Sequence, residues 1–107
     1  MQFHRVNNTC RVSRITGPTH NFLELELDEA IQSPLFVEQV GPPPETGQER
    51  LDQEVVVEHI LGGILEASRA YGPLPRLSRI RYVASDSKPE AVYHALAFAL
   101  IERYFRT

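Results

Sequence analysis

The sequence predicts an α+β fold, a two-layer sandwich in which a mainly antiparallel sheet of three to five strands carries two helices on one face. Residues 21–28 and 77–84 alternate between apolar and polar side chains, which is the pattern of a strand with one buried face. Two longer stretches, 47–71 and 88–106, carry apolar residues at helical spacing, and each begins with a capping-box sequence. We expect a single domain over residues 1–107, because that length is enough for one hydrophobic core.

The first two strands are expected at residues 10–16 and 21–28, joined by a turn at residues 17–20. In the second run, apolar and acidic side chains alternate: Leu23, Leu25 and Leu27 on one face, and Glu24, Glu26 and Asp28 on the other. We expect the leucines to be buried, with Arg11 and Ser13 opposite Glu24 and Glu26 on the solvent face. Residues 3–6 are a candidate for a short preceding strand, and residues 35–40 for a short strand or an ordered loop.

The first helix follows a proline-rich connector, residues 41–47, in which three consecutive prolines forbid regular strand pairing. The capping box from Thr46 to Glu49 predicts the helix start, and Gly72-Pro73 predicts its end. Gly62 and Gly63 lie inside this helix, where each glycine costs about 1 kcal/mol relative to alanine. That cost suggests a kink or the close approach of another backbone; a hinge or a ligand contact is the functional alternative.

The third strand, residues 77–84, places Arg79 and Arg81 on its polar face. If it pairs with residues 21–28, one of these arginines should come within ion-pair distance of Glu24 or Glu26. A second capping box, from Ser87 to Glu90, predicts the start of the last helix at residue 88.

The last helix is apolar over most of its circumference, which is more than the one stripe that a surface helix normally buries. Its aliphatic face is expected to serve the core, and consists of Val92, Leu96, Ala99 and Leu100. A second face remains as surplus, and consists of His94, Phe98, Ile101 and Phe105. Because two exposed phenylalanines would form an unusually large apolar patch, we predict that this second face binds another protein chain. The two faces can exchange these roles.

The distribution of charge and the cysteine content indicate what kind of protein this is. The net charge of −3 is unevenly distributed, with +3 in residues 1–20, −10 in residues 21–66 and +4 in residues 67–107. These segments can neutralise one another in the fold or form an acidic face for a basic partner. The single cysteine, Cys10, and the lack of an apolar leader or of 18 consecutive apolar residues predict a cytoplasmic protein without a membrane span.

Motifs for chemistry are sparse. The four histidines have no metal-ligand spacing and no nucleotide-binding loop is present, so we expect no metal and no cofactor. Cys10 reads as a small buried residue, and the Ser85-Asp86-Ser87 segment as helix capping. The leading hypothesis is a small non-catalytic accessory protein, either a homo-oligomer or a subunit of a larger assembly. The alternatives are a small enzyme whose site assembles at an oligomer interface from His20, Asp86 or similar residues, and a nucleic-acid binder that uses the arginine-bearing strand.

Overall fold

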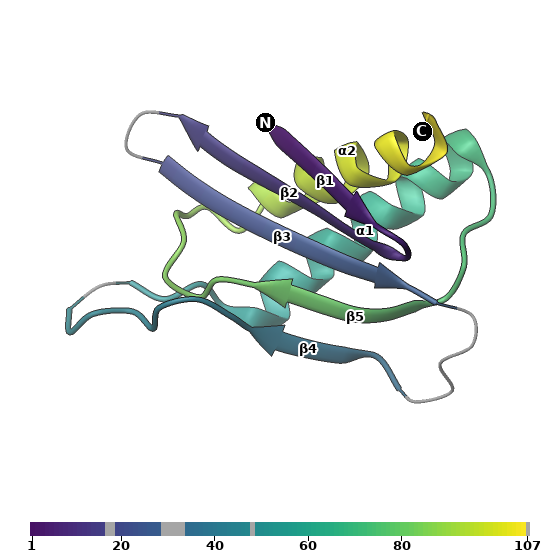
Figure 1. Ribbon diagram of the computed structural model, residues 1–107. Coiled ribbons are helices and arrows are strands. Elements are labelled where there is room, and N and C mark those ends of the chain that lie inside the picture. Colours follow the sequence, from purple (N-terminus) through teal and green to yellow (C-terminus); the bar gives the residue numbers. More distant parts are fainter. Residues whose placement is uncertain (17–18, 29–33, 48, 107) are drawn as a thin grey trace.

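The computed structural model describes residues 1–16, 19–28, 34–47 and 49–106, which form a five-stranded sheet with two helices on one face (Figure 1). The strand order is β1-β2-β3-β5-β4; β4 runs parallel to β5, and every other neighbouring pair is antiparallel. The elements are β1 (Gln2–Val6), β2 (Thr9–Thr16), β3 (Thr19–Leu27), β4 (Phe36–Gln39), α1 (Gln53–Tyr71), β5 (Leu77–Tyr82) and α2 (Val92–Arg106). The predicted α+β sandwich is confirmed.

The hydrophobic core lies between the sheet and the two helices. Leu23, Leu25 and Leu27 are all at most 1% exposed, so the predicted orientation of β3 is confirmed. The sheet also contributes Cys10, Val12, Ile80 and Tyr82, and the helices contribute Val56, Ile60, Ala67, Tyr93, Leu96, Ala97, Leu100 and Ile101. Period-two strands and a helix layer therefore share one apolar interior, with polar side chains on the opposite face of the sheet.

Strand register decides which charges meet. Arg11 is opposite Glu24, as expected, but Ser13 pairs with Phe22 and not with Glu26. The strands are antiparallel, so moving two residues forward on β2 moves two residues back on β3. On the other side of β3, Glu24 is opposite Arg81, and the Arg81 Nη1 to Glu24 Oε2 distance of 3.0 Å confirms the predicted ion pair.

The first helix begins later than its sequence predicts, at Gln53 and not near residue 47. Asp52 is the N-cap, and its side chain accepts a hydrogen bond from the backbone N–H of Val55. Gly47 has a φ of +83°, a left-handed conformation that cannot begin a right-handed helix. Buried Leu51 then ties the connector to the core, since its N–H donates to the carbonyl of Ala84 at 3.0 Å.

The last helix also starts late, at Val92 and not at residue 88. The hydroxyl of Ser87 does not cap it, because it accepts a hydrogen bond from the backbone N–H of His20 at 2.9 Å. The carboxylate of Glu90 instead accepts from the N–H of Asp52, ahead of α1, and the Lys88–Pro89 peptide bond is cis.

Two strand boundaries differ by two residues from the prediction, the start of β3 and the end of β5. Strand β5 ends at Tyr82, two residues before its predicted end. Of the turn predicted at residues 17–20, Thr19 and His20 belong to β3. Residues 17 and 18 lie outside the described residues.

The two helices pack closely at Gly63. A Cβ atom added there would collide with the backbone carbonyl of His94 and would lie 3.1 Å from the Ala97 Cβ. At neighbouring Gly62, an added Cβ would meet only the His94 ring, at 3.2 Å. The expected close approach of another backbone is therefore confirmed at Gly63, and that backbone belongs to α2.

Candidate functional site

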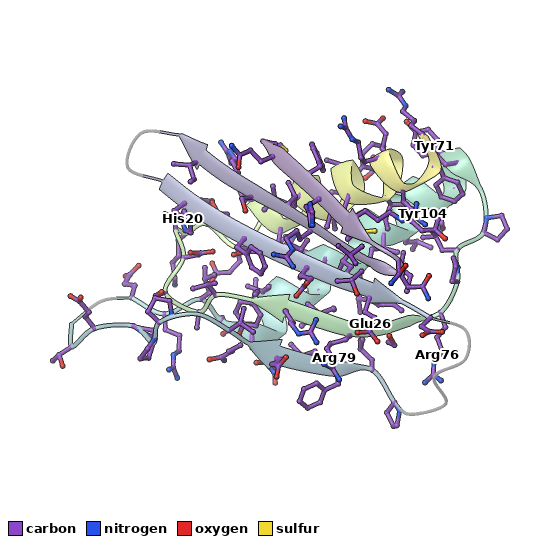
Figure 2. The ribbon with its side chains drawn as sticks, viewed as in Figure 1. His20, Glu26, Tyr71, Arg76, Arg79 and Tyr104 are labelled. Carbon is purple, nitrogen blue, oxygen red and sulfur yellow. The ribbon has the colours of Figure 1, made fainter. Side chains whose placement is uncertain are left out.

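The face of the sheet opposite the helices is here called the outer face. Among the described residues, no helix covers it (Figure 1). Alternation along the strands places these side chains on it: Arg11, Ser13 and Ile15 of β2; His20, Phe22, Glu24 and Glu26 of β3; Phe36 and Glu38 of β4; and Arg79 and Arg81 of β5. Figure 2 shows Glu26 and Arg79 on neighbouring strands of this face.

A row of alternating charges crosses the outer face from β2 to β4. Glu24 lies at its centre, 3.5 Å from the Arg11 guanidinium and 3.0 Å from that of Arg81. Arg81 also contacts the Glu38 carboxylate at 2.7 Å. The hydrogen bond to Glu38 is the main cause of the raised pKa of Arg81, and Glu24 adds to it. Although Glu24 belongs to the uncovered face, these contacts leave it only 8% exposed. The row is therefore an ordered, largely neutralised array.

Large apolar side chains lie at the margins of the outer face. Ile15, on β2, is 68% exposed, and Phe36, on the edge strand β4, is 52% exposed. The Arg79 guanidinium lies 5.5 Å from the centre of the Phe36 ring, in a cation–π contact. Ordered charges flanked by exposed apolar groups are features shared with protein interfaces, which combine arginines and aromatic residues.

A histidine–aspartate pair lies where β3 begins. His20 Nδ1 is 2.8 Å from Asp86 Oδ1, and the backbone N–H of Phe22 donates to Asp86 Oδ2 at 2.7 Å. Asp86 is buried, and burial raises the pKa of its carboxyl group, while the hydrogen bonds from His20 and Phe22 act in the opposite direction. The His20 side chain is about half exposed (Figure 2), and its register partner is Ile15.

This pair can perform proton transfer in principle. A carboxylate bonded to Nδ1 orients the imidazole ring and leaves Nε2 to accept or donate a proton. Both His20 and Asp86 are candidates from the sequence, but only the fold brings them together, across 66 positions of the chain.

The residues predicted to bind a partner on the last helix do not form one exposed face. Ile101 is fully buried, and Phe98 packs 6.2 Å from the ring of Tyr71 on α1. His94 contacts Glu66 of α1 through a 2.6 Å hydrogen bond. Phe105 also stacks on Tyr71, but it remains 36% exposed.

Of this face, only Ile101 is fully buried within the chain, whereas His94 and Phe98 are partly covered and Phe105 is exposed. Gly63 lets α1 approach α2 closely, so α1 covers side chains that the sequence left without a neighbour. The contact of this face with another protein chain stays a prediction.

The remaining candidates are structural. Cys10 is buried, and burial raises the pKa of its thiol, so the thiolate is disfavoured. Ser85 donates a hydrogen bond to the carbonyl of Pro42. Within the described residues, no group of three His, Cys, Asp or Glu side chains is arranged to hold a metal ion. No helix of the described residues has the length and apolar character needed to cross a membrane.

No protein-family model matches this chain, and no curated protein shows significant similarity to it.

Ile15 and Phe36 are exposed apolar residues that were not predicted from the sequence. For Ile15, the alternation of β2 carried a usable signal, since Cys10 and Val12 on the buried face place residue 15 on the other face. For Phe36 no such signal existed, because β4 is only four residues long.

Proposed function

We propose that this chain is a non-catalytic accessory protein that acts through contacts with another protein chain, and that the outer face of the sheet makes those contacts. The observation that carries the proposal is the exposure of Ile15 and Phe36 on a sheet face that no described helix covers. In a two-layer sandwich the second face of the sheet is normally polar. Exposed large apolar groups on it are a feature of surfaces that bind partners.

The charges on this face favour a second copy of the chain as the partner. The described strands place three arginines, Arg11, Arg79 and Arg81, and three glutamates, Glu24, Glu26 and Glu38, on the outer face, and Asp28 lies beside them just after β3. A two-fold interface is self-complementary, so a surface that carries both signs of charge can meet its own copy with opposite charges facing one another. A heterologous subunit is the alternative occupant. The same mixture of charges weakens the nucleic-acid hypothesis, since Glu24 and Glu38 already pair with the arginines that phosphates would need.

Light scattering coupled to size exclusion tests this proposal. The native chain should have the mass of a dimer, and Ile15→Asp or Phe36→Asp should yield monomers with unchanged circular dichroism. Leu61→Asp and Leu65→Asp are matched controls, because these leucines are 43% and 52% exposed on α1, away from the outer face. They should leave the dimer intact.

Two results would contradict this proposal in different ways. If Phe105→Asp alone dissociates the dimer, the contact lies on the last helix, as its sequence first suggested. The outer face is not an interface if two results are found together. The chain is monomeric up to millimolar concentration, and the native chain and Phe36→Asp, each immobilised, retain the same set of proteins from a cell lysate.

The alternative function, a small enzyme with a site at an oligomer interface, draws support from the His20–Asp86 contact. His20 is the register partner of Ile15, so an outer-face dimer would cover the imidazole and shield it from water. Hydrolysis of p-nitrophenyl acetate tests the basic chemistry. An enzyme should show a saturable rate that His20→Ala abolishes and His59→Ala preserves. Equal small losses from both variants would indicate only ordinary surface imidazoles.

A further inference from the structure

A cavity of about 520 Å³ lies on the helix side of the sheet, between the β1–β2 hairpin and the C-terminal half of α2. Its walls include Phe3 and Arg5 of β1, Cys10 of β2, and Leu100, Arg103 and Tyr104 of α2. Cavities that hold small organic molecules in proteins are generally about 300–1,000 Å³. Arg5 lies on the helix side of the sheet, because it pairs with Cys10 of the core, and the last helix closes the cavity with Leu100, Arg103 and Tyr104.

Two arginines are held in place at this cavity by aromatic rings. The guanidinium of Arg5 lies 4.4 Å from the centre of the Tyr104 ring, and that of Arg103 lies 5.1 Å from the centre of the Phe3 ring. Arg5 Nε also donates to the backbone carbonyl of Asn7 at 3.0 Å. Stacking engages the flat face of a guanidinium, whereas its donors lie in its plane. A guanidinium can therefore stay stacked on a ring while a donor at its edge binds an anion.

The rest of the lining consists of His4, Asn7 and four residues with apolar surface or a weakly polar group, Phe3, Cys10, Leu100 and Tyr104. Cys10 and Leu100 are at most 4% exposed, and burial favours the neutral thiol of Cys10. The described residues that line the cavity include no aspartate or glutamate. In a chain with net charge −3, this cavity is a local basic site with an apolar floor. That combination is complementary to a molecule with an anionic head and an apolar body.

We propose that this cavity binds a small organic anion, in which a carboxylate, sulfonate or phosphate meets Arg5 and Arg103 and an apolar body packs on Phe3, Leu100 and Tyr104. The proposal is independent of the outer-face contact, because it uses the helix side of β1 and the end of α2. Protein partners and small anions can occupy these two regions separately.

Two fluorescent probes with the same aromatic skeleton test the proposal. 1-Anilinonaphthalene-8-sulfonate carries an anionic head, and N-phenyl-1-naphthylamine lacks it. The sulfonate should bind saturably with one site per chain. Charge-assisted hydrogen bonds predict that Arg5→Gln and Arg103→Gln each weaken it by about tenfold or more, while the neutral probe changes by less than about twofold. Arg50→Gln and Arg69→Gln are the control pair, because each removes one positive charge, as each test variant does, at a position that does not line the cavity.

The single cysteine provides a second readout, because it lies in the cavity wall. Saturating sulfonate probe should slow the alkylation of Cys10 by a maleimide in the native chain, and should do so less in Arg5→Gln. The proposal is overturned if both probes lose affinity equally in the arginine variants, if the control pair weakens the sulfonate as much, or if bound probe leaves Cys10 alkylation unchanged. Failure to saturate with the sulfonate would overturn it as well.

Discussion

Substituting Gly63 by alanine should destabilise the protein, although alanine is the better helix former. Helix propensity alone would stabilise the folded state by about 1 kcal/mol. The added methyl group, however, would collide with the backbone carbonyl of His94, which is fixed within α2 and cannot rotate away. It would also lie 3.1 Å from the Ala97 Cβ.

The size of the effect follows from this geometry. A carbon and a carbonyl oxygen ordinarily approach to about 3.3–3.6 Å, so the two helices must separate by about 1 Å to admit the methyl group. Inserting a methyl group into a packed interior costs about 1–3 kcal/mol, and a rigid backbone neighbour places Gly63 at the upper end. Subtracting the propensity gain leaves a net loss of about 2 kcal/mol, or about 10 °C in Tm for a chain of this size.

Gly62→Ala is the matched control, one residue away in the same helix. Its methyl group would meet only the end of the His94 side chain, at 3.2 Å, and that ring can move. This variant should be neutral or more stable by up to about 1 kcal/mol. Urea unfolding followed by circular dichroism measures both variants. Equal stabilities for the two would show that α1 and α2 do not approach closely at Gly63.

Three further predictions concern the sheet and the loop before α2. Glu24→Gln should lower the free energy of unfolding by about 1–2 kcal/mol, because it weakens a nearly buried ion pair with Arg81. A double-mutant cycle with Arg81→Met should show that the two losses are not additive, and additive losses would contradict the contact. The hydrogen bond from Asp52 N–H lowers the pKa of Glu90, so its stabilisation is present above its ordinary pKa of 4.5 and is lost as the pH falls through the lower folded value. Glu90→Gln should therefore cost about 1 kcal/mol at pH 7 and match the native chain in acid; a difference that persists in acid would refute this origin. Leu25→Ala should cost about 2–5 kcal/mol in chemical denaturation, and a cost below 1 kcal/mol would contradict its burial.

Much of the fold could be predicted from local pattern. The leucines of β3 could be assigned to the core because side chains alternate strictly along a strand. The pairing of β3 with β5 could be inferred because opposite charges recur at the same period on both strands. The helix starts were less predictable, since capping-box residues also serve turns, and Ser87 bonds to His20 in place of capping a helix.

The candidate sites depended on tertiary structure. His20 and Asp86 could be named as candidates, but their contact requires the start of β3 to meet the loop between β5 and α2. The sequence determined that the last helix is apolar nearly all round, and it could not determine what covers it. What covers the last helix depends on how closely α1 approaches it, and α1 can approach closely because Gly63 has no side chain at the contact. The pattern of apolar residues along the sequence indicates which side chains must be buried. Which residues surround them is decided only when the helices and strands pack together.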